Sequence, residues 1–156
     1  MALNPGDPAP SLSIRNQSGK TVKLSDYSGK YVLLYFYPKD NTPGCTIEAK
    51  SLRDHYAEFT KLNAVILGVS KQDETSHKEF ISQHQLPFDL LVDSDGTLAK
   101  SVGVDSIPVV GLLKRQSVLI DPAGRIAKIY RDVDAGKHAE EVLADIQKVQ
   151  KQPKQK

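Results

Sequence analysis

The feature that most constrains the fold is an unbroken apolar run, Tyr-Val-Leu-Leu-Tyr-Phe-Tyr, at residues 31–37. A strand that faces water on one side alternates polar and apolar residues, and this run does not alternate. It therefore predicts a strand that is covered on both faces. Such strands are typical of the centre of a largely parallel sheet.

Segments with strand and helix patterns follow one another along the rest of the chain, so we expect an α/β fold in which helices cover both faces of a mixed central sheet. The short stretches Asn-Gln-Ser-Gly-Lys and Pro-Ala-Gly are typical of tight turns and should join two pairs of strands as hairpins. Strands are expected at Leu12–Ile14, Thr21–Leu24, Ala64–Ser70, Phe88–Val92, Ser117–Asp121 and Ile126–Tyr130, and helices at Glu74–His84, from the Asp-Ser-Asp-Gly turn to about Val102, and from about Lys137 to Val149.

The length of 156 residues suits one domain with a single core. We assign this domain to residues 1–147 and expect residues 148–156, which hold four lysines and no acidic residue, to form a disordered basic tail. The remainder lacks the cluster of basic residues that nucleic-acid binding needs, and no apolar run approaches the roughly 20 residues that cross a bilayer. Since residues 1–10 show neither a basic leader nor an apolar segment, we expect a cytoplasmic location.

The chain has one cysteine, Cys45, which excludes an intrachain disulfide and a cysteine-based metal cluster. It lies in the loop after the buried strand, at the end of the sheet where open α/β folds bind ligands. Thr42 followed by Pro43 is typical of a helix N-cap and a first helical residue. Gly44 and Cys45 then fall in the first turn, where amides lack intrahelical partners and the helix dipole favours an anion. We therefore expect the Cys45 thiol to ionise more readily than a free cysteine.

The spacing of the following apolar residues predicts which way the sulfur of Cys45 points. The helix that begins near Thr42 places on the same face Ala49, Leu52, Tyr56 and Phe59. The sulfur should therefore face the sheet, in a recess with an apolar floor. Gly44, which has no side chain, would let a small substrate approach the backbone amides. A buried structural cysteine remains the alternative.

Residues 35–46, Tyr-Phe-Tyr-Pro-Lys-Asp-Asn-Thr-Pro-Gly-Cys-Thr, resemble the active-site signature of peroxiredoxins, in particular the peroxiredoxin Q and bacterioferritin comigratory protein branch. The lead-in Pro-Gly-Asp-Pro-Ala-Pro at residues 5–10 and the segments at 23–30 and 114–124 are similar to this family too. The resemblance implies a thioredoxin-like fold with an N-terminal hairpin extension. It also implies thiol-dependent reduction of hydroperoxides without a metal, haem or flavin.

The resemblance also implies roles for individual residues. Cys45 would be the peroxidatic nucleophile, which attacks a peroxide oxygen and becomes a sulfenic acid. Thr42 would hydrogen-bond the substrate through its hydroxyl, and Pro38 would shield the thiolate from water. Arg115 would face the thiolate and hold the peroxide oxygens, while Glu48 would orient that arginine. Together with the amides of the first helical turn, the guanidinium would stabilise the charge that develops on the departing oxygen.

One position departs from many members of this branch. They carry a second cysteine five residues after the first, and this chain has Lys50 there. We therefore expect a one-cysteine cycle in which an external thiol, namely glutathione, a glutaredoxin or a thioredoxin-like protein, reduces the sulfenic acid. A Cys45–Cys45 bridge between two molecules is a less favoured alternative, because the sulfur should face inward. The branch suggests a monomer or a weak homodimer.

Two other functions are weighed against the peroxidase. A disulfide reductase on the same frame would normally need Cys-x-x-Cys, and Thr42 stands in the place of its first cysteine. A redox sensor or binding protein would use Cys45 stoichiometrically, without turnover.

The remaining polar motifs do not predict a site. The histidines form no metal-binding pattern: His55 should lie about 15 Å from Cys45 along the same helix. We expect partly exposed, solvated side chains for the other histidines, which are His77, His84 and His138. Asp93-Ser-Asp-Gly and Asn16-Gln-Ser are interpreted as turns.

Overall fold

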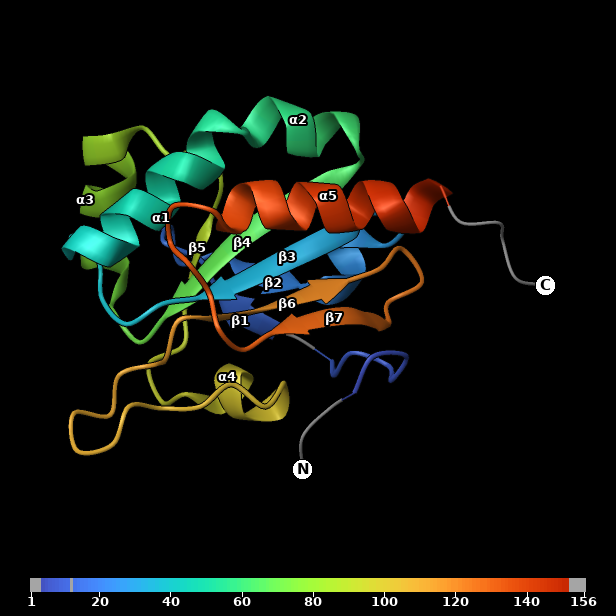
Figure 1. The fold of residues 1–156 in the computed structure, drawn as a ribbon. Coiled ribbons are helices and arrows are strands. Elements are labelled where there is room, and N and C mark those ends of the chain that lie inside the picture. Colours follow the sequence, from blue (N-terminus) through green and yellow to red (C-terminus); the bar gives the residue numbers. More distant parts are fainter. Residues whose placement is uncertain (1–3, 12, 152–156) are drawn as a thin grey trace.

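The computed structural model describes residues 4–11 and 13–151. Within these ranges the main sheet has five strands, which are β3 (Tyr31–Phe36), β4 (Ala64–Ser70), β5 (Leu90–Val92), β6 (Gln116–Ile120) and β7 (Ile126–Tyr130). Their order across the sheet is β5-β4-β3-β6-β7, so the apolar run forms the central strand (Figure 1). β4 runs parallel to β3 and β5 runs parallel to β4, whereas β6 and β7 add an antiparallel pair on the other side.

Both faces of this sheet are covered, as the sequence predicts. One face carries α1 (Pro43–Asp54), α2 (Tyr56–Lys61), α3 (Glu74–His84) and α5 (His138–Lys151) (Figure 1). The other face carries α4 (Thr97–Ser101), and next to it lie the short helix η1 (Leu24–Tyr27) and the antiparallel hairpin of β1 (Ser13–Arg15) and β2 (Thr21–Lys23). No helix in the described part of the chain has the length and apolar character needed to cross a membrane.

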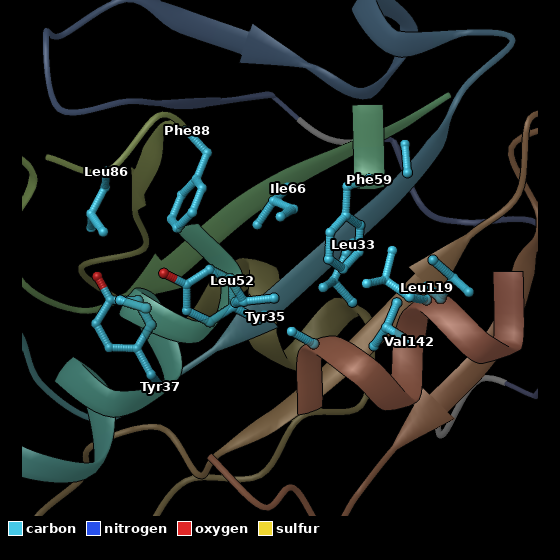
Figure 2. Packing of buried hydrophobic residues seen from close by; sticks show 14 of the residues in the cluster. Leu33, Tyr35, Tyr37, Leu52, Phe59, Ile66, Leu86, Phe88, Leu119 and Val142 are labelled. Atoms are coloured by element: carbon cyan, nitrogen blue, oxygen red, sulfur yellow. The ribbon is translucent and has the colours of Figure 1, made fainter. Parts of the chain in front are cut away.

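The central strand contributes to the packing on both faces, which explains why its sequence does not alternate. Leu33 and Tyr35 point towards the layer of α1 and α5, while Val32 and Leu34 point towards α4. Figure 2 shows the first of these two clusters, in which the rings of Tyr35 and Tyr37 lie side by side. Their centroids are 5.4 Å apart in a stacked arrangement. These two rings form the apolar layer behind the loop that carries the cysteine.

The prediction of one long helix after Thr42 is wrong in one respect. The structure has two helices there, α1 and α2, which are separated at His55. His55 has backbone angles of φ −99° and ψ 6°, outside the helical range. Its ring contacts the carbonyl oxygen of Ser51 at 2.7 Å, the same oxygen that accepts the backbone N–H of residue 55. The apolar spacing continues across the junction, so the sequence pattern alone does not reveal the break.

The ends of some elements also differ from the sequence expectation. The last helix runs to Lys151, two residues beyond the predicted end at Val149. Residues 152–156 and Leu12, the expected first residue of the N-terminal hairpin, lie outside the described residues. β5 begins at Leu90, two residues later than predicted.

Candidate active site

Cys45 and Arg115 meet at one end of the sheet. The loop that leads into α1 and Cys45 follows the carboxyl end of β3, and β6 runs antiparallel to β3 with Gln116 opposite Phe36. Arg115, the residue just before β6, therefore lies at the same end. Its Nη2 donates a hydrogen bond to Sγ of Cys45 at 3.5 Å, across 70 residues of sequence.

The start of α1 places the cysteine. Thr42 is the N-cap residue with extended backbone angles of φ −85° and ψ 154°, and Pro43 is the first helical residue, as predicted. The Thr42 carbonyl accepts the N–H of Thr46 at 2.8 Å. The Thr42 side chain makes no capping hydrogen bond, and its hydroxyl donates to the carbonyl oxygen of Lys39 at 2.8 Å. The hydroxyl oxygen keeps its lone pairs for another donor.

Cys45 is the third residue of the helix, and its side chain is only 1% exposed. Ala49 and Leu52, on the same helical face, are fully buried in the cluster that includes Tyr35. The sulfur therefore faces the sheet, as the spacing predicts. The amide groups of Gly44 and Cys45 belong to the first turn, where N–H groups have no intrahelical acceptor.

Glu48 and Arg115 form an ion pair beside the sulfur. Nη1 of Arg115 donates to Oε1 of Glu48 at 2.9 Å, while Nη2 of the same guanidinium contacts Cys45. The Glu48 side chain is fully buried, whereas the Arg115 side chain is 22% exposed. One planar group therefore links Cys45 to a buried carboxyl group one helical turn further along α1.

Burial and charge oppose each other at this pair. Desolvation raises the pKa of Glu48 from 4.5 to about 7, although the charge and hydrogen bond of Arg115 act in the other direction. Desolvation would lower the pKa of Arg115, and the negative charges of Cys45 and Glu48 outweigh it, so this pKa is raised. Within the described residues, Oε2 of Glu48 and the hydroxyl of Tyr35 have no hydrogen-bond partner.

The two other residues that the sequence singled out lie before and within the first turn of α1. Pro38 is partly buried and follows directly on Tyr37, in the loop between β3 and α1. Gly44 lies against the guanidinium of Arg115. Its lack of a side chain therefore makes room for the arginine, a neighbour that the sequence argument did not foresee.

Sequence reasoning missed a buried polar cluster in the same loop. The carboxylate of Asp40 accepts hydrogen bonds from the Tyr37 hydroxyl at 2.6 Å and the Ser76 hydroxyl at 2.7 Å, and it lies 2.7 Å from Nδ1 of His77. The expectation of an exposed His77 is wrong, since its side chain is 0% exposed. One signal was present: His77 lies three residues before the buried Phe80, so the two share a helical face.

The expectation of a solvated His138 is also wrong. Its side chain is buried, with Nε2 at 2.8 Å from Oγ of Ser117 and Nδ1 at 3.1 Å from Oε1 of Glu141. A serine, a histidine and a carboxylate in this order can activate a nucleophile, but Ser117 is 0% exposed and no substrate can approach it. This cluster therefore connects α5 to β6 rather than forming a second active site. His138 lies four residues before the buried Val142 and shares its helical face.

The other polar motifs have the local roles that their sequences predict. Asp93 begins a tight turn in which the Gly96 N–H bonds to its carbonyl oxygen at 2.9 Å. Asn16 lies in the turn of the β1–β2 hairpin, where its side chain accepts two backbone N–H groups. His84 is half-buried and contacts Asn41 through its Nε2 at 3.2 Å.

Comparison with known proteins identifies the family of the chain. Residues 5–129 match the AhpC/TSA family. A curated relative, peroxiredoxin Bcp of Bacillus subtilis (strain 168), is 44% identical over 149 residues, which cover 92% of this chain and 94% of the relative.

Solved structures agree with this match. A cysteine-to-serine mutant of Xylella fastidiosa PrxQ superposes with a TM-score of 0.89 and 32% identity, covering 97% of this chain and 99% of that one. A structure of the Xanthomonas campestris bacterioferritin comigratory protein, described in connection with alkyl peroxide reduction, has a TM-score of 0.83 and 32% identity over 90% of this chain and 92% of that one. The chain therefore belongs to the AhpC/TSA family and is a peroxiredoxin of the Bcp and PrxQ type, a thiol-dependent peroxidase with a thioredoxin-like fold.

Proposed function

We propose that the chain reduces hydrogen peroxide and organic hydroperoxides through Cys45, in a one-cysteine cycle. The contact between Nη2 of Arg115 and Sγ of Cys45 carries this proposal, because it sets a permanent positive charge beside the nucleophile. Such a charge stabilises the thiolate, which is the reactive form of the cysteine. The Xanthomonas protein described above, which is associated with alkyl peroxide reduction, supports the choice of substrate class.

In the first step, the Cys45 thiolate attacks the terminal oxygen of a hydroperoxide. An S–O bond forms and the O–O bond breaks. The electron pair of that bond leaves on the second oxygen, which takes up a proton and departs as water or an alcohol. The sulfur is thereby oxidised to a sulfenic acid and the peroxide is reduced.

The residues around the sulfur have complementary roles in this step. The Thr42 hydroxyl oxygen, whose hydrogen is used by the Lys39 carbonyl, accepts the O–H of the hydroperoxide. The guanidinium of Arg115 and the amides of Gly44 and Cys45 are fixed donors at the place where negative charge develops on the departing oxygen. Donors that are oriented before the reaction stabilise the transition state without further reorganisation.

Two further residues support this arrangement. Oε1 of Glu48 accepts a hydrogen bond from Nη1 of Arg115, and this bond orients Nη2 of the same guanidinium towards the sulfur. Pro38, in the loop before the helix, limits the access of water to the thiolate. Neither residue exchanges electrons or protons with the peroxide in this scheme.

An external thiol completes the cycle. Position 50, on the exposed side of α1, is a lysine, and Cys45 is the only cysteine of the chain, so an intramolecular disulfide cannot form. A first thiol, from glutathione, a glutaredoxin or a thioredoxin-like protein, condenses with the sulfenic acid to give water and a mixed disulfide. A second thiol displaces Cys45 from that disulfide and restores the starting thiol.

Peroxide consumption with dithiothreitol, glutathione and thioredoxin as separate reductants tests this proposal. Many equivalents should be consumed per protein, and the activity should disappear both in Cys45→Ser and in wild-type protein alkylated beforehand. Intact-mass analysis after one equivalent of peroxide should show an oxygen adduct or a mixed disulfide. Consumption of a single equivalent that no thiol restores would instead indicate a redox sensor, and a covalent dimer as the main product would exclude the one-cysteine cycle.

We further propose that the protein is cytoplasmic, because a free thiol suits a reducing compartment. From the family branch we propose a monomer or a weak homodimer. Cell fractionation tests the location, and sedimentation velocity across a range of concentrations tests the oligomeric state, which a dimer that persists on dilution would contradict.

A further inference from the structure

Asp40 lies in the middle of the loop between β3 and Cys45, and it is almost completely buried at 5% exposure. A buried carboxylate is costly unless donors surround it. Here Oδ1 accepts the Tyr37 hydroxyl, while Oδ2 accepts the Ser76 hydroxyl and faces Nδ1 of His77. Two of these three partners come from α3, so the loop is attached to that helix through one side chain.

His77 extends the attachment to a third element. Its second ring nitrogen, Nε2, lies 2.9 Å from the backbone carbonyl oxygen of Leu91 in β5. The ring is 0% exposed, so no water competes for either nitrogen. One imidazole therefore joins the loop before Cys45 to the sheet, through contacts that span 37 residues to Asp40 and 14 residues to Leu91.

The two contacts of this ring use acceptors from different segments. A carbonyl oxygen can only accept, so Nε2 of His77 carries the hydrogen that bonds to Leu91. Burial would raise the pKa of Asp40, but the hydrogen bonds from His77, Tyr37 and Ser76 outweigh it and lower this pKa. His77 therefore connects Asp40 on one side of its ring with Leu91 on the other.

The short segment from Asp40 to Cys45 needs such an anchor. Asn41 has a φ of +61°, in the left-handed region that residues other than glycine adopt at a cost in energy. A second contact from α3, between His84 Nε2 and the Asn41 side chain at 3.2 Å, lies on the exposed side of the loop. Thr42 follows directly, and Cys45 is three residues further along. A shift of Asp40 therefore moves the two groups that contact the peroxide.

On the basis of the proposed peroxidase function, we propose that His77 is a positioning residue for the reaction: through its hydrogen bond to Asp40 it holds the loop so that Thr42 and Cys45 meet the substrate in the reactive geometry. His77 itself touches neither the peroxide nor the sulfur. Misplacement of reacting groups by about 1 Å can cost on the order of a hundredfold in rate, so a loop held less firmly should have a large effect on catalysis.

Two substitutions of His77 distinguish the effect of its contact with Asp40 from that of its contact with Leu91. The amide nitrogen of an asparagine can take the place of Nδ1, whereas that of a glutamine can take the place of Nε2. His77→Asn therefore keeps a donor for Asp40 and gives up the contact with Leu91. His77→Gln keeps the contact with Leu91 and gives up the donor for Asp40. Both replace a buried aromatic ring by a smaller amide, so a purely structural role would affect both variants alike.

We expect His77→Gln to lower kcat/KM for hydrogen peroxide by about tenfold or more, mainly through kcat, and His77→Asn to retain activity within about threefold of the wild type. Hydrogen exchange of the backbone N–H groups at residues 39–42 and 44–47 should become faster in His77→Gln than in His77→Asn. His138→Gln is the matched control, because His138 is an equally buried, doubly bonded histidine on α5 whose partners, Ser117 and Glu141, lie outside this loop. It should leave kcat/KM and the exchange of the loop unchanged.

Ser76→Ala provides a milder variant in case the substitutions at His77 prevent folding. It removes one donor from Oδ2 of Asp40 and should lower kcat/KM by about threefold. Equal activities of His77→Asn and His77→Gln, whether both normal or both reduced, would overturn the positioning role. The peroxidase proposal would survive that result, since it fails only if the wild type itself shows no turnover that depends on Cys45.

Discussion

Gly44 leaves the space that the guanidinium of Arg115 occupies. A β-carbon on residue 44 would lie 2.7 Å from Nη2 of Arg115 and 3.4 Å from its Cζ. Nη2 is also the atom that contacts the sulfur of Cys45. The smallest residue at the start of α1 is therefore a condition for the contact between the arginine and Cys45.

Gly44→Ala should uncouple activity from stability. The added methyl group meets the end of a flexible side chain, so Arg115 will move while the fold stays intact, and alanine favours a helix over glycine by up to about 1 kcal/mol. We expect kcat/KM for peroxide to fall by about tenfold or more with no loss of thermal stability. Gly136→Ala is the matched control, because its β-carbon would meet nothing closer than 3.7 Å. Full activity of Gly44→Ala would show that Arg115 need not occupy this place.

Arg115→Lys should reduce activity although the charge is kept. The guanidinium contacts Cys45 and Glu48 with two different nitrogens, and a single ammonium group cannot reproduce this planar fork. Loss of one oriented donor costs about a hundredfold in comparable sites, so we expect kcat/KM to fall by about that factor. Arg125 is an exposed arginine beyond the opposite end of β6, and Arg125→Lys is the control for replacing an arginine by a lysine elsewhere in the protein. Steady-state kinetics of the two variants provide the measurement, and equal rates would contradict the role of Arg115.

The buried Glu48 should make stability depend on pH. Burial raises the pKa of its carboxyl from 4.5 to about 7, so between these values the folded protein binds a proton that the unfolded chain has released. Because the native state binds more protons in this window, the free energy of unfolding falls as pH rises through it, by roughly 3 kcal/mol from this group. Below pH 4.5, where both the folded and the unfolded state bind the proton, this loss of stability is absent.

Glu48→Gln should therefore flatten the dependence of stability on pH. Urea unfolding at several pH values across this window gives the slope for the wild type and the variant. Glu79→Gln, an exposed glutamate on α3, controls for the loss of a negative charge and should leave the slope unchanged. An unaltered slope in Glu48→Gln would show that this carboxyl does not titrate in the window.

The residues around Cys45 differ in how far sequence reasoning could place them. The Thr-Pro pair predicts where α1 begins, and the helical spacing of Ala49 and Leu52 predicts that the sulfur faces the sheet; both predictions are confirmed. These are local properties, set by capping preferences and by the period of a helix. Arg115, 70 residues away, came only from the resemblance to peroxiredoxins.

The sequence by itself therefore determined most of the elements, their order and the position of the cysteine in the first turn of a helix, because period, turn residues and helix starts act over a few neighbouring residues. Only the tertiary structure decided which polar groups leave water. His77 is buried because Asp40 and Leu91, from two other segments, offer acceptors on both sides of its ring. The burial of a polar side chain depends on hydrogen-bond partners that the fold brings together. A local sequence pattern does not show which distant segments will supply those partners.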